Sequence, residues 1–253
     1  MDQHDNLNYR VLGNGHPVVF LHGFLESLTM WSSLDLENAP FQSILIDLPG
    51  HGGSDLIDNA EEPTISFMAN EVHKVLLKRN VTSYDVVGHS MGGYVALELK
   101  RIDPKCGRIV LLNSNFWEDA EDKKRDRVRV AEMVFRAKDL FIQEAIPGLF
   151  YRHDRKDAVI IDLVSEAKRM DAVGIAYASL AMRARADRSG VLKTTPDQVL
   201  IIQGQHDPLI SQVRMKEELN GLDVRTVVLH RSGHMAHVEE PQSVLQLVTD
   251  FLK

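Results

Sequence analysis

The stretch VVGHSMGG at residues 86–93 places a serine between two glycines. The five residues from Gly88 to Gly92 follow the pattern G-x-S-x-G. The valines favour a strand and Met91 opens a segment with helical periodicity, so Ser90 falls on a strand-to-helix turn. Such a sharp turn admits only small neighbours and lifts the serine hydroxyl clear of the sheet. The stretch therefore predicts a serine nucleophile; the alternative is an ordinary turn serine.

A serine hydroxyl is a weak nucleophile unless a base accepts its proton and an acidic group orients that base. Asp207 in QGQHDP and His234 in SGH each follow an apolar strand pattern. Ligands of open α/β sheets bind beyond the carboxyl ends of the strands, so we expect both side chains to approach Ser90. The alternatives are a turn role for Asp207 before Pro208 and a competing base at His237.

Attack on a carbonyl carbon places negative charge on its oxygen, which backbone N–H groups stabilise. Met91 directly follows the candidate nucleophile and supplies one such amide. The sequence His22-Gly23-Phe24 follows an earlier apolar strand pattern, and the amide of Phe24 is the candidate for the second. The N-terminus of the helix after Ser90 also favours negative charge at this point.

The strand and helix patterns along the chain predict the scaffold that positions these residues. Short apolar runs rich in β-branched residues recur, as in a parallel sheet covered on both faces. The runs lie at residues 18–21, 44–46, 84–87, 109–112, 199–202 and 224–229, with an edge strand at 9–12. Helical patterns lie between them at residues 64–79, 91–101 and 241–252. This alternation predicts a three-layer αβα sandwich with a mostly parallel sheet.

Residues 116–188 break the alternation, since they show helical periodicity without a clear strand. The segment is too long for a loop in a compact domain. We interpret it as a helical insertion, so that residues 1–115 and 189–253 form the core domain. The charged run EDAEDKKRDRVR at 118–129 is typical of a solvated helix face.

A substrate pocket is expected between the insertion and the strand ends. Its candidate residues are aromatic side chains of the insertion together with residues near the strand ends: His22, Tyr94, Trp117, Phe135, Phe150 and His237. For the aromatic residues, the alternative is packing of the insertion onto the core. For histidines in the glycine-rich loops, including His51 and His89, the alternative is a structural role, because an imidazole can tie two loops together through its two nitrogens.

Composition excludes several classes of function. The net charge of −7 argues against binding to nucleic acid or an anionic membrane, which calls for a basic surface. The single cysteine, Cys106, rules out an internal disulfide. The polar start MDQHDNLNYR lacks a signal pattern, and the apolar runs are too short to span a bilayer. We therefore expect a soluble, cytoplasmic monomer or homodimer that acts on a small molecule.

The motifs together resemble the α/β-hydrolase fold superfamily. The matching stretches, in family order from residue 21 to residue 241, are LHGF, DLPGHGGSD, VVGHSMGG, QGQHDPL and SGHMAHVEEP. The resemblance implies an α/β-hydrolase fold with a helical cap after the sixth strand. It favours His234 over His237 as the base, because the family follows its Gly-His with Glu and Pro. It implies a serine hydrolase that cleaves a small carboxylic ester or related acyl compound through an acyl-enzyme, without a cofactor or metal.

Other members of this superfamily leave alternatives open. Carbon–carbon bond hydrolases share the framework, and some members are non-catalytic receptors. The stretches DLPGHGGS and GHMAH are similar to those of the menaquinone-pathway lyase SHCHC synthase. That lyase carries an arginine in S-x-G-G-R to hold a dicarboxylate, whereas this chain has Tyr94 there. The arginines of the insertion that could replace it are Arg125, Arg127, Arg129, Arg183 and Arg185.

Overall fold

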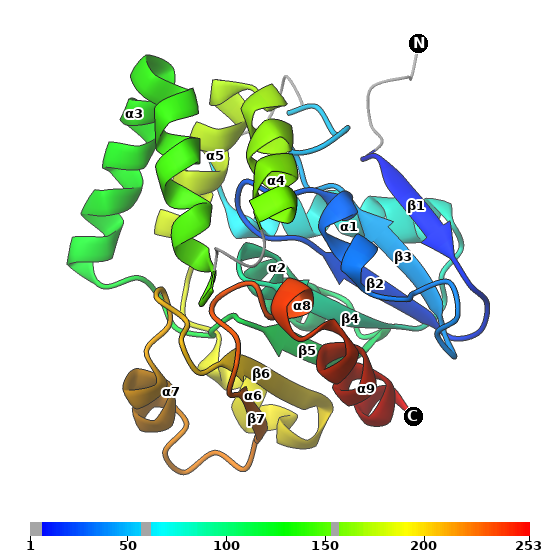
Figure 1. Cartoon of the computed structure of the whole chain (residues 1–253). Helices are drawn as coiled ribbons and strands as arrows, with labels where there is room; N and C mark the ends of the chain where they lie inside the picture. The colour runs from blue at the N-terminus through cyan, green and yellow to red at the C-terminus, as the bar shows by residue number, and fades with distance from the viewer. Residues whose placement is uncertain (1–6, 57–61, 153–156) are drawn as a thin grey trace.

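A computed structural model describes residues 7–56, 62–152 and 157–253 (Figure 1). Its sheet has seven strands in the order β1-β3-β2-β4-β5-β6-β7, and β1 alone runs antiparallel to its neighbour. The strands are β1 (Tyr9–Leu12), β2 (Pro17–Leu21), β3 (Gln42–Ile46), β4 (Tyr84–His89), β5 (Cys106–Leu112), β6 (Val199–Gly204) and β7 (Arg225–Leu229). The expected mostly parallel α/β sheet is confirmed.

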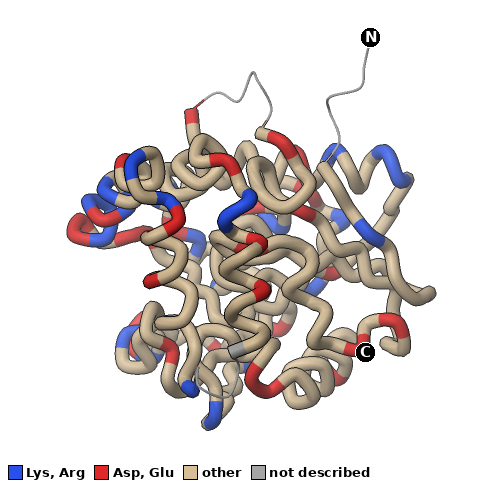
Figure 2. The backbone as a smooth tube through the Cα atoms, turned by 45° about the horizontal axis from the view of Figure 1, so that its top comes forward, with Lys and Arg blue, Asp and Glu red and all other residues tan. Residues whose placement is uncertain are grey.

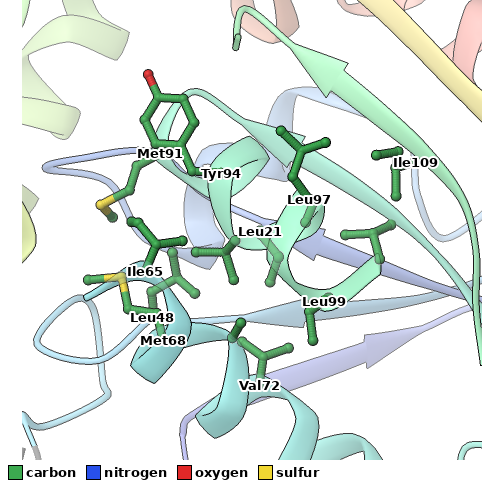
Figure 3. Close-up of a cluster of buried hydrophobic side chains, with 14 of the residues drawn as sticks. Leu21, Leu48, Ile65, Met68, Val72, Met91, Tyr94, Leu97, Leu99 and Ile109 are labelled. Atoms are coloured by element: carbon green, nitrogen blue, oxygen red, sulfur yellow. The ribbon is translucent and has the colours of Figure 1, made fainter. Parts of the chain in front are cut away.

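Helices cover both faces of the sheet, as the continuous apolar strands require. On one face α1 (Ile65–Lys78) and α2 (Met91–Ile102) pack in a cluster with alternate strand residues such as Val86 (Figure 3). On the other face the short 3-10 helix η1 (Leu28–Ser33) and α9 (Pro241–Leu252) pack against the intervening residues. Because side chains alternate across a strand, each of the strands β2 to β6 supplies both clusters.

The segment between β5 and β6 is helical, and its main helices lie together over one end of the sheet (Figure 1). They are α3 (Glu121–Ala145), α4 (Asp157–Arg169) and α5 (Ala172–Arg183), with a short 3-10 helix η2 (Pro147–Leu149) after α3. These helices share an apolar cluster of their own. The segment follows β5, the fifth of the seven strands, whereas the resemblance implied a position after the sixth.

Shorter helices complete the chain: α6 (Ser189–Thr194), η4 (Pro196–Gln198), α7 (Gln212–Glu218) and α8 (Ala236–Glu239). Acidic and basic residues are interspersed over the described part of the chain (Figure 2). Near the start of α3, Lys124 pairs with Glu121 and Arg129 with Asp126, which fits a solvated helix face. Among the described residues, no helix has both the length and the apolar character needed to cross a membrane.

Candidate active site

Ser90 occupies a strained turn between β4 and α2. Its backbone has φ 48° and ψ −113°, a conformation that residues other than glycine rarely adopt. The Ser90 amide donates a hydrogen bond to the carbonyl of Leu112 at 3.0 Å, and the Ser114 hydroxyl donates to the Ser90 carbonyl at 2.7 Å. Both partners come from the end of β5 and the residues after it. The neighbouring strand therefore holds the strained residue in place.

Glycines around Ser90 allow backbone segments to approach one another closely. A Cβ atom on Gly88 would lie 2.4 Å from the carbonyl oxygen of Gly92, across the turn. A Cβ atom on Gly92 would lie 2.2 Å from the carbonyl oxygen of Leu21, at the end of β2. The sequence prediction that only small residues fit beside Ser90 is supported by these distances. They also show that the start of α2 rests directly on β2.

Gly92→Ala is expected to lower the free energy of unfolding by about 3 kcal/mol, because overpacking against backbone cannot be relieved by a side-chain rotation. Urea denaturation followed by circular dichroism measures the change. Gly148→Ala is the matched control, since a Cβ atom there would meet nothing within 4 Å. Equal stability of the two variants would contradict the packing described here.

Three side chains from three strand ends form one line of hydrogen bonds. His234 Nε2 lies 2.9 Å from Ser90 Oγ, and His234 Nδ1 lies 2.8 Å from Asp207 Oδ2. An ionised carboxylate only accepts, so Nδ1 carries the proton and Nε2 is free to accept the proton of the Ser90 hydroxyl. His234 and Asp207 are buried, whereas Ser90 is partly exposed. This arrangement can withdraw a proton from Ser90 during attack on a carbonyl group.

Besides His234, other groups also hold the carboxylate of Asp207 in place. Its Oδ1 accepts the backbone amides of Leu209 at 2.8 Å and Ile210 at 3.1 Å. Its Oδ2 also accepts side-chain amides from Asn113 at 2.9 Å and Gln203 at 3.0 Å. Burial opposes ionisation, but the electrostatic interaction with His234 and these hydrogen bonds hold the pKa of Asp207 below its ordinary value. The group is therefore ionised at neutral pH.

The two candidate oxyanion donors belong to segments that meet beside Ser90. Met91 is the first residue of α2, and its neighbour Gly92 touches the end of β2. Phe24 follows Gly23, whose Cβ position would be 2.8 Å from His89 Nδ1, next to the turn. Among the described loop and cap hydrogen bonds, neither the Phe24 nor the Met91 amide donates to a carbonyl. Both amides therefore remain the candidates for binding a substrate oxygen.

The candidate pocket residues are placed in different surroundings. The buried His22 ring accepts the Leu48 amide at Nε2 (2.8 Å), and its Nδ1 lies 2.8 Å from the Gly23 carbonyl, so both nitrogens tie loops together. His237 is fully buried beside Trp31, with ring centroids 5.5 Å apart. Phe150 is also buried, in the apolar cluster of the insertion. These three side chains are buried, so each packs within the protein.

Phe135 differs from the other candidates, because it is 61% exposed. Its neighbour Val134 is 2% exposed and packs inside the insertion, so Phe135 lies on the outer face of α3. Tyr94 and Trp117 line a cavity of about 130 Å³ together with Phe116 and Arg185. Helical periodicity indicated that α3 has an inner face, but it did not show which residues form that face.

The arginines of the insertion do not supply a free cation at Tyr94. The buried Arg185 lies 4.1 Å above the Tyr94 ring and pairs with Asp119 at 2.7 Å. Its other nitrogens donate to the carbonyls of Trp117 and Met182. Arg127 also pairs with Asp119. The remaining three candidates are exposed: Arg125, Arg129 and Arg183.

Supporting residues around His234 were missed by the sequence analysis. The His234 amide donates to the carbonyl of Leu149 at 2.8 Å. Glu239 accepts the amides of Gly233 at 2.7 Å and Tyr151 at 2.9 Å. The middle of the helical insertion, just after α3, is thus bonded to the loop that carries the candidate base. Only the Glu of the SGHMAHVEEP stretch signalled this in the sequence.

Buried histidines make the fold sensitive to acid. Burial lowers the pKa of His51 and of His237 from 6.5 to about 3. The unfolded chain takes up these protons as the pH falls below 6.5, while the folded chain does not, so stability decreases with decreasing pH. Each histidine is expected to cost about 2 kcal/mol between pH 6.5 and pH 5. Urea denaturation at several pH values measures this slope.

His237→Gln should flatten that slope, because glutamine does not titrate. His230→Gln, at an exposed position, is the matched control and should leave the slope unchanged. The titration of Glu26 does not affect this window. The pKa of Glu26 is lowered from 4.5 to about 2, so its contribution to the free energy of unfolding is lost only when the pH falls below 5. An unchanged slope in the His237 variant would refute the assignment.

Comparisons with known proteins agree with this fold. The chain matches the alpha/beta hydrolase family over residues 18–247. An esterase from Thermogutta terrifontis has a TM-score of 0.87 and 28% identity, covering 97% of this chain and 92% of that chain. An enol-lactonase from Burkholderia xenovorans LB400 shares the fold, with a TM-score of 0.83 and 22% identity, covering 97% and 96% of the two chains.

A relative by sequence is 2-succinyl-6-hydroxy-2,4-cyclohexadiene-1-carboxylate synthase (SHCHC synthase) of Escherichia coli O157:H7. It is 26% identical over 250 residues, which cover 93% of each chain. The family match extends from β2 into α9 and includes the strand ends that carry Ser90, Asp207 and His234. The chain therefore belongs to the alpha/beta hydrolase family.

Proposed function

We propose that this protein is a serine hydrolase that cleaves small carboxylic esters or related acyl compounds. The observation that carries the proposal is the continuous line of hydrogen bonds from Asp207 through His234 to Ser90, with Ser90 on a strained turn at the start of α2. Family membership and the 28% identity to an esterase support it. Nucleophile, base and orienting acid then have distinct roles.

The reaction proceeds through a covalent intermediate. Ser90 Oγ attacks the carbonyl carbon of the ester while His234 Nε2 takes its proton, and the ionised Asp207 stabilises the resulting imidazolium. The amides of Phe24 and Met91 bind the oxyanion. Collapse expels the alcohol, which receives the proton from His234, and leaves an acyl group on Ser90. A water activated by His234 then releases the carboxylic acid and restores the enzyme.

A small, uncharged acyl group is the substrate that the surroundings favour. Arg185 and Arg127 are both engaged with Asp119, so neither is free for a substrate carboxylate. Side chains of the insertion, such as Phe150, form an apolar cluster with Leu25 and Met235, which flank the loops of the site. A substrate that binds beside Ser90 is therefore expected to carry an apolar acyl chain.

A panel of p-nitrophenyl esters from acetate to dodecanoate tests the proposal. We expect turnover that is highest for short chains and unaffected by a metal chelator. A fluorophosphonate should label the protein once, and peptide mass spectrometry should place the label on Ser90. Absence of both turnover and labelling in the folded protein would refute a serine hydrolase.

A lyase function of the SHCHC synthase type is the second candidate. Its support is the 26% identity to that enzyme along nearly the whole chain. The engaged arginines weigh against it, because the dicarboxylate of such a substrate would lack a free cationic partner. Formation of pyruvate from the substrate of that synthase, measured with lactate dehydrogenase, distinguishes the two functions.

A further inference from the structure

A buried histidine and a buried glutamate lie directly behind the candidate active site. His89 is fully buried and Glu26 is 5% exposed. His89 Nδ1 lies 2.9 Å from Glu26 Oε2, and His89 Nε2 lies 2.9 Å from the backbone carbonyl oxygen of His234. The mechanism above uses neither side chain. Their burial is costly unless they contribute to the fold or to the site.

The hydrogen-bond partners dictate where the protons reside. A backbone carbonyl only accepts, so Nε2 of His89 must carry a hydrogen. Glu26 Oε2 also accepts the amide of Gly23 at 2.6 Å, as a carboxylate does. With an ionised Glu26, Nδ1 of His89 donates as well and the ring is a cation. The pair is therefore a buried ion pair in which every contact has a donor and an acceptor.

The pKa shifts agree with this assignment. Burial alone disfavours both charges, but the mutual attraction of the two groups overcomes it, so the pKa of His89 is raised and the pKa of Glu26 is lowered to about 2. The other titratable groups facing His89 are His234, His237 and Asp207. Burial keeps His237 neutral, with a pKa of about 3, so it adds no second cation beside the pair.

This ion pair connects the segments that carry the candidate nucleophile, the candidate base and a candidate oxyanion donor. His89 immediately precedes the candidate nucleophile, and its ring holds the backbone of His234. Glu26 holds the amide of Gly23, which immediately precedes the candidate oxyanion donor Phe24. These loops follow three different strands, β2, β4 and β7.

We propose that Glu26 and His89 form a positioning pair, which fixes the oxyanion loop and the base relative to the nucleophile. The inference rests on the proposed serine hydrolase mechanism and extends it to two residues that touch no substrate. Near-attack geometry is sensitive to shifts of about 1 Å, so loosening these loops should lower the rate of the chemical step more than substrate binding.

Glu26→Leu tests the inference, because leucine removes both contacts of the carboxylate. We expect kcat per active site to fall about 100-fold while KM changes less than about threefold. Glu26→Gln should restore only part of the rate: an amide oxygen at the Oε2 position still accepts the Gly23 amide, but it carries no charge to stabilise a protonated His89. Glu26→Asp keeps the charge but shortens the reach, so it should lower kcat about 10-fold.

Asp85→Leu is the matched control. Asp85 lies at the start of β4, whereas His89 lies at its end, and Asp85 is a buried carboxylate that also pairs with a histidine, His16, at 3.1 Å. Its loss should lower stability without lowering kcat per active site. Active sites are counted by stoichiometric reaction with a fluorophosphonate, so that unfolded protein does not count.

The outcomes separate the inference from the proposed function. A rate per active site that is unchanged in Glu26→Leu and Glu26→Asp, with only the melting temperature lowered, would show a merely structural pair and overturn the inference. Should Glu26→Leu not fold, Glu26→Asp alone decides. A wild-type protein without Ser90-dependent turnover or labelling would instead refute the hydrolase mechanism, and the positioning role with it.

Discussion

Replacing Ser90 by alanine is expected to lower kcat/KM for short-chain esters by about 10⁴-fold to 10⁶-fold. Without Oγ, no acyl-enzyme forms, and His234 Nε2 loses the hydroxyl that lies 2.9 Å away. The residual rate comes from water attack assisted by the oxyanion donors and by substrate binding. Because alanine fits the same turn, the melting temperature should change little. Hydrolysis of p-nitrophenyl acetate and thermal unfolding measure both effects.

Ser43→Ala is the matched control for this variant. Ser43 is a fully buried serine on β3, and its hydroxyl has no hydrogen-bond partner among the described atoms. Its removal should leave both rate and stability close to those of the wild type. Undiminished turnover in Ser90→Ala would exclude Ser90 as the nucleophile and with it the acyl-enzyme mechanism.

The line of residues from Ser90 to Asp207 was predictable because each residue follows a strand. In a parallel sheet, consecutive strands end at the same edge, so residues distant in sequence converge there. Local sequence patterns located the strand ends, and the parallel topology of the sheet brings those ends together at one edge. The structure brings Ser90, Asp207 and His234 within hydrogen-bonding distance, as the sequence analysis expected.

The surroundings of these residues were not predictable in the same way. The contact of His89 with the His234 carbonyl depends on side-chain directions across two loops, which no sequence period encodes. The exposed position of Phe135 follows from the packing of α3 on its neighbours, and apolar character alone suggested the opposite. A glutamate in a loop after a strand, such as Glu26, gives no local sign of burial.

The link between the insertion and His234 has a consequence for substrate choice. Leu149, at the end of η2, accepts the amide of His234, so the segment that carries Phe150 is bonded to the base itself. Substitutions that reshape the insertion can therefore disturb the base as well as the pocket. Changes at Phe150 are expected to alter acyl-chain preference and kcat together, whereas changes at the exposed Phe135 should alter neither.

Asp207→Asn is expected to lower kcat by about 10⁴-fold while leaving Ser90 and His234 in place. The Oδ1 atom of Asp207 accepts two backbone amides, from Leu209 and Ile210, so the asparagine oxygen should remain there. The asparagine NH₂ group then faces His234 Nδ1 and donates to it. His234 would carry its hydrogen on Nε2, pointing at Ser90, and could no longer accept the serine proton.

The side-chain amides that contact residue 207 can adapt to that reversal. Gln203 and Asn113 each have a buried side-chain oxygen without a hydrogen-bond partner among the described atoms. Rotation of either amide by 180° would offer an acceptor to the new NH₂ group but would break its bond to the Gly233 or Ile210 carbonyl, so the loss of stability should be about that of one hydrogen bond, about 1 kcal/mol. The defect would then lie in the tautomer of His234 and not in folding.

Asp47→Asn is the matched control, because Asp47 is also a buried aspartate just after a strand. Its carboxylate accepts the amides of Leu28 and Gly53 and does not contact His234. It should lower stability while kcat per active site stays near the wild-type value. Proton NMR provides the mechanistic test, since the Nδ1 proton shared with Asp207 should resonate far downfield in the wild type and disappear in Asp207→Asn. A variant that loses this proton yet retains its rate would show that orientation of His234 by Asp207 is not required for turnover.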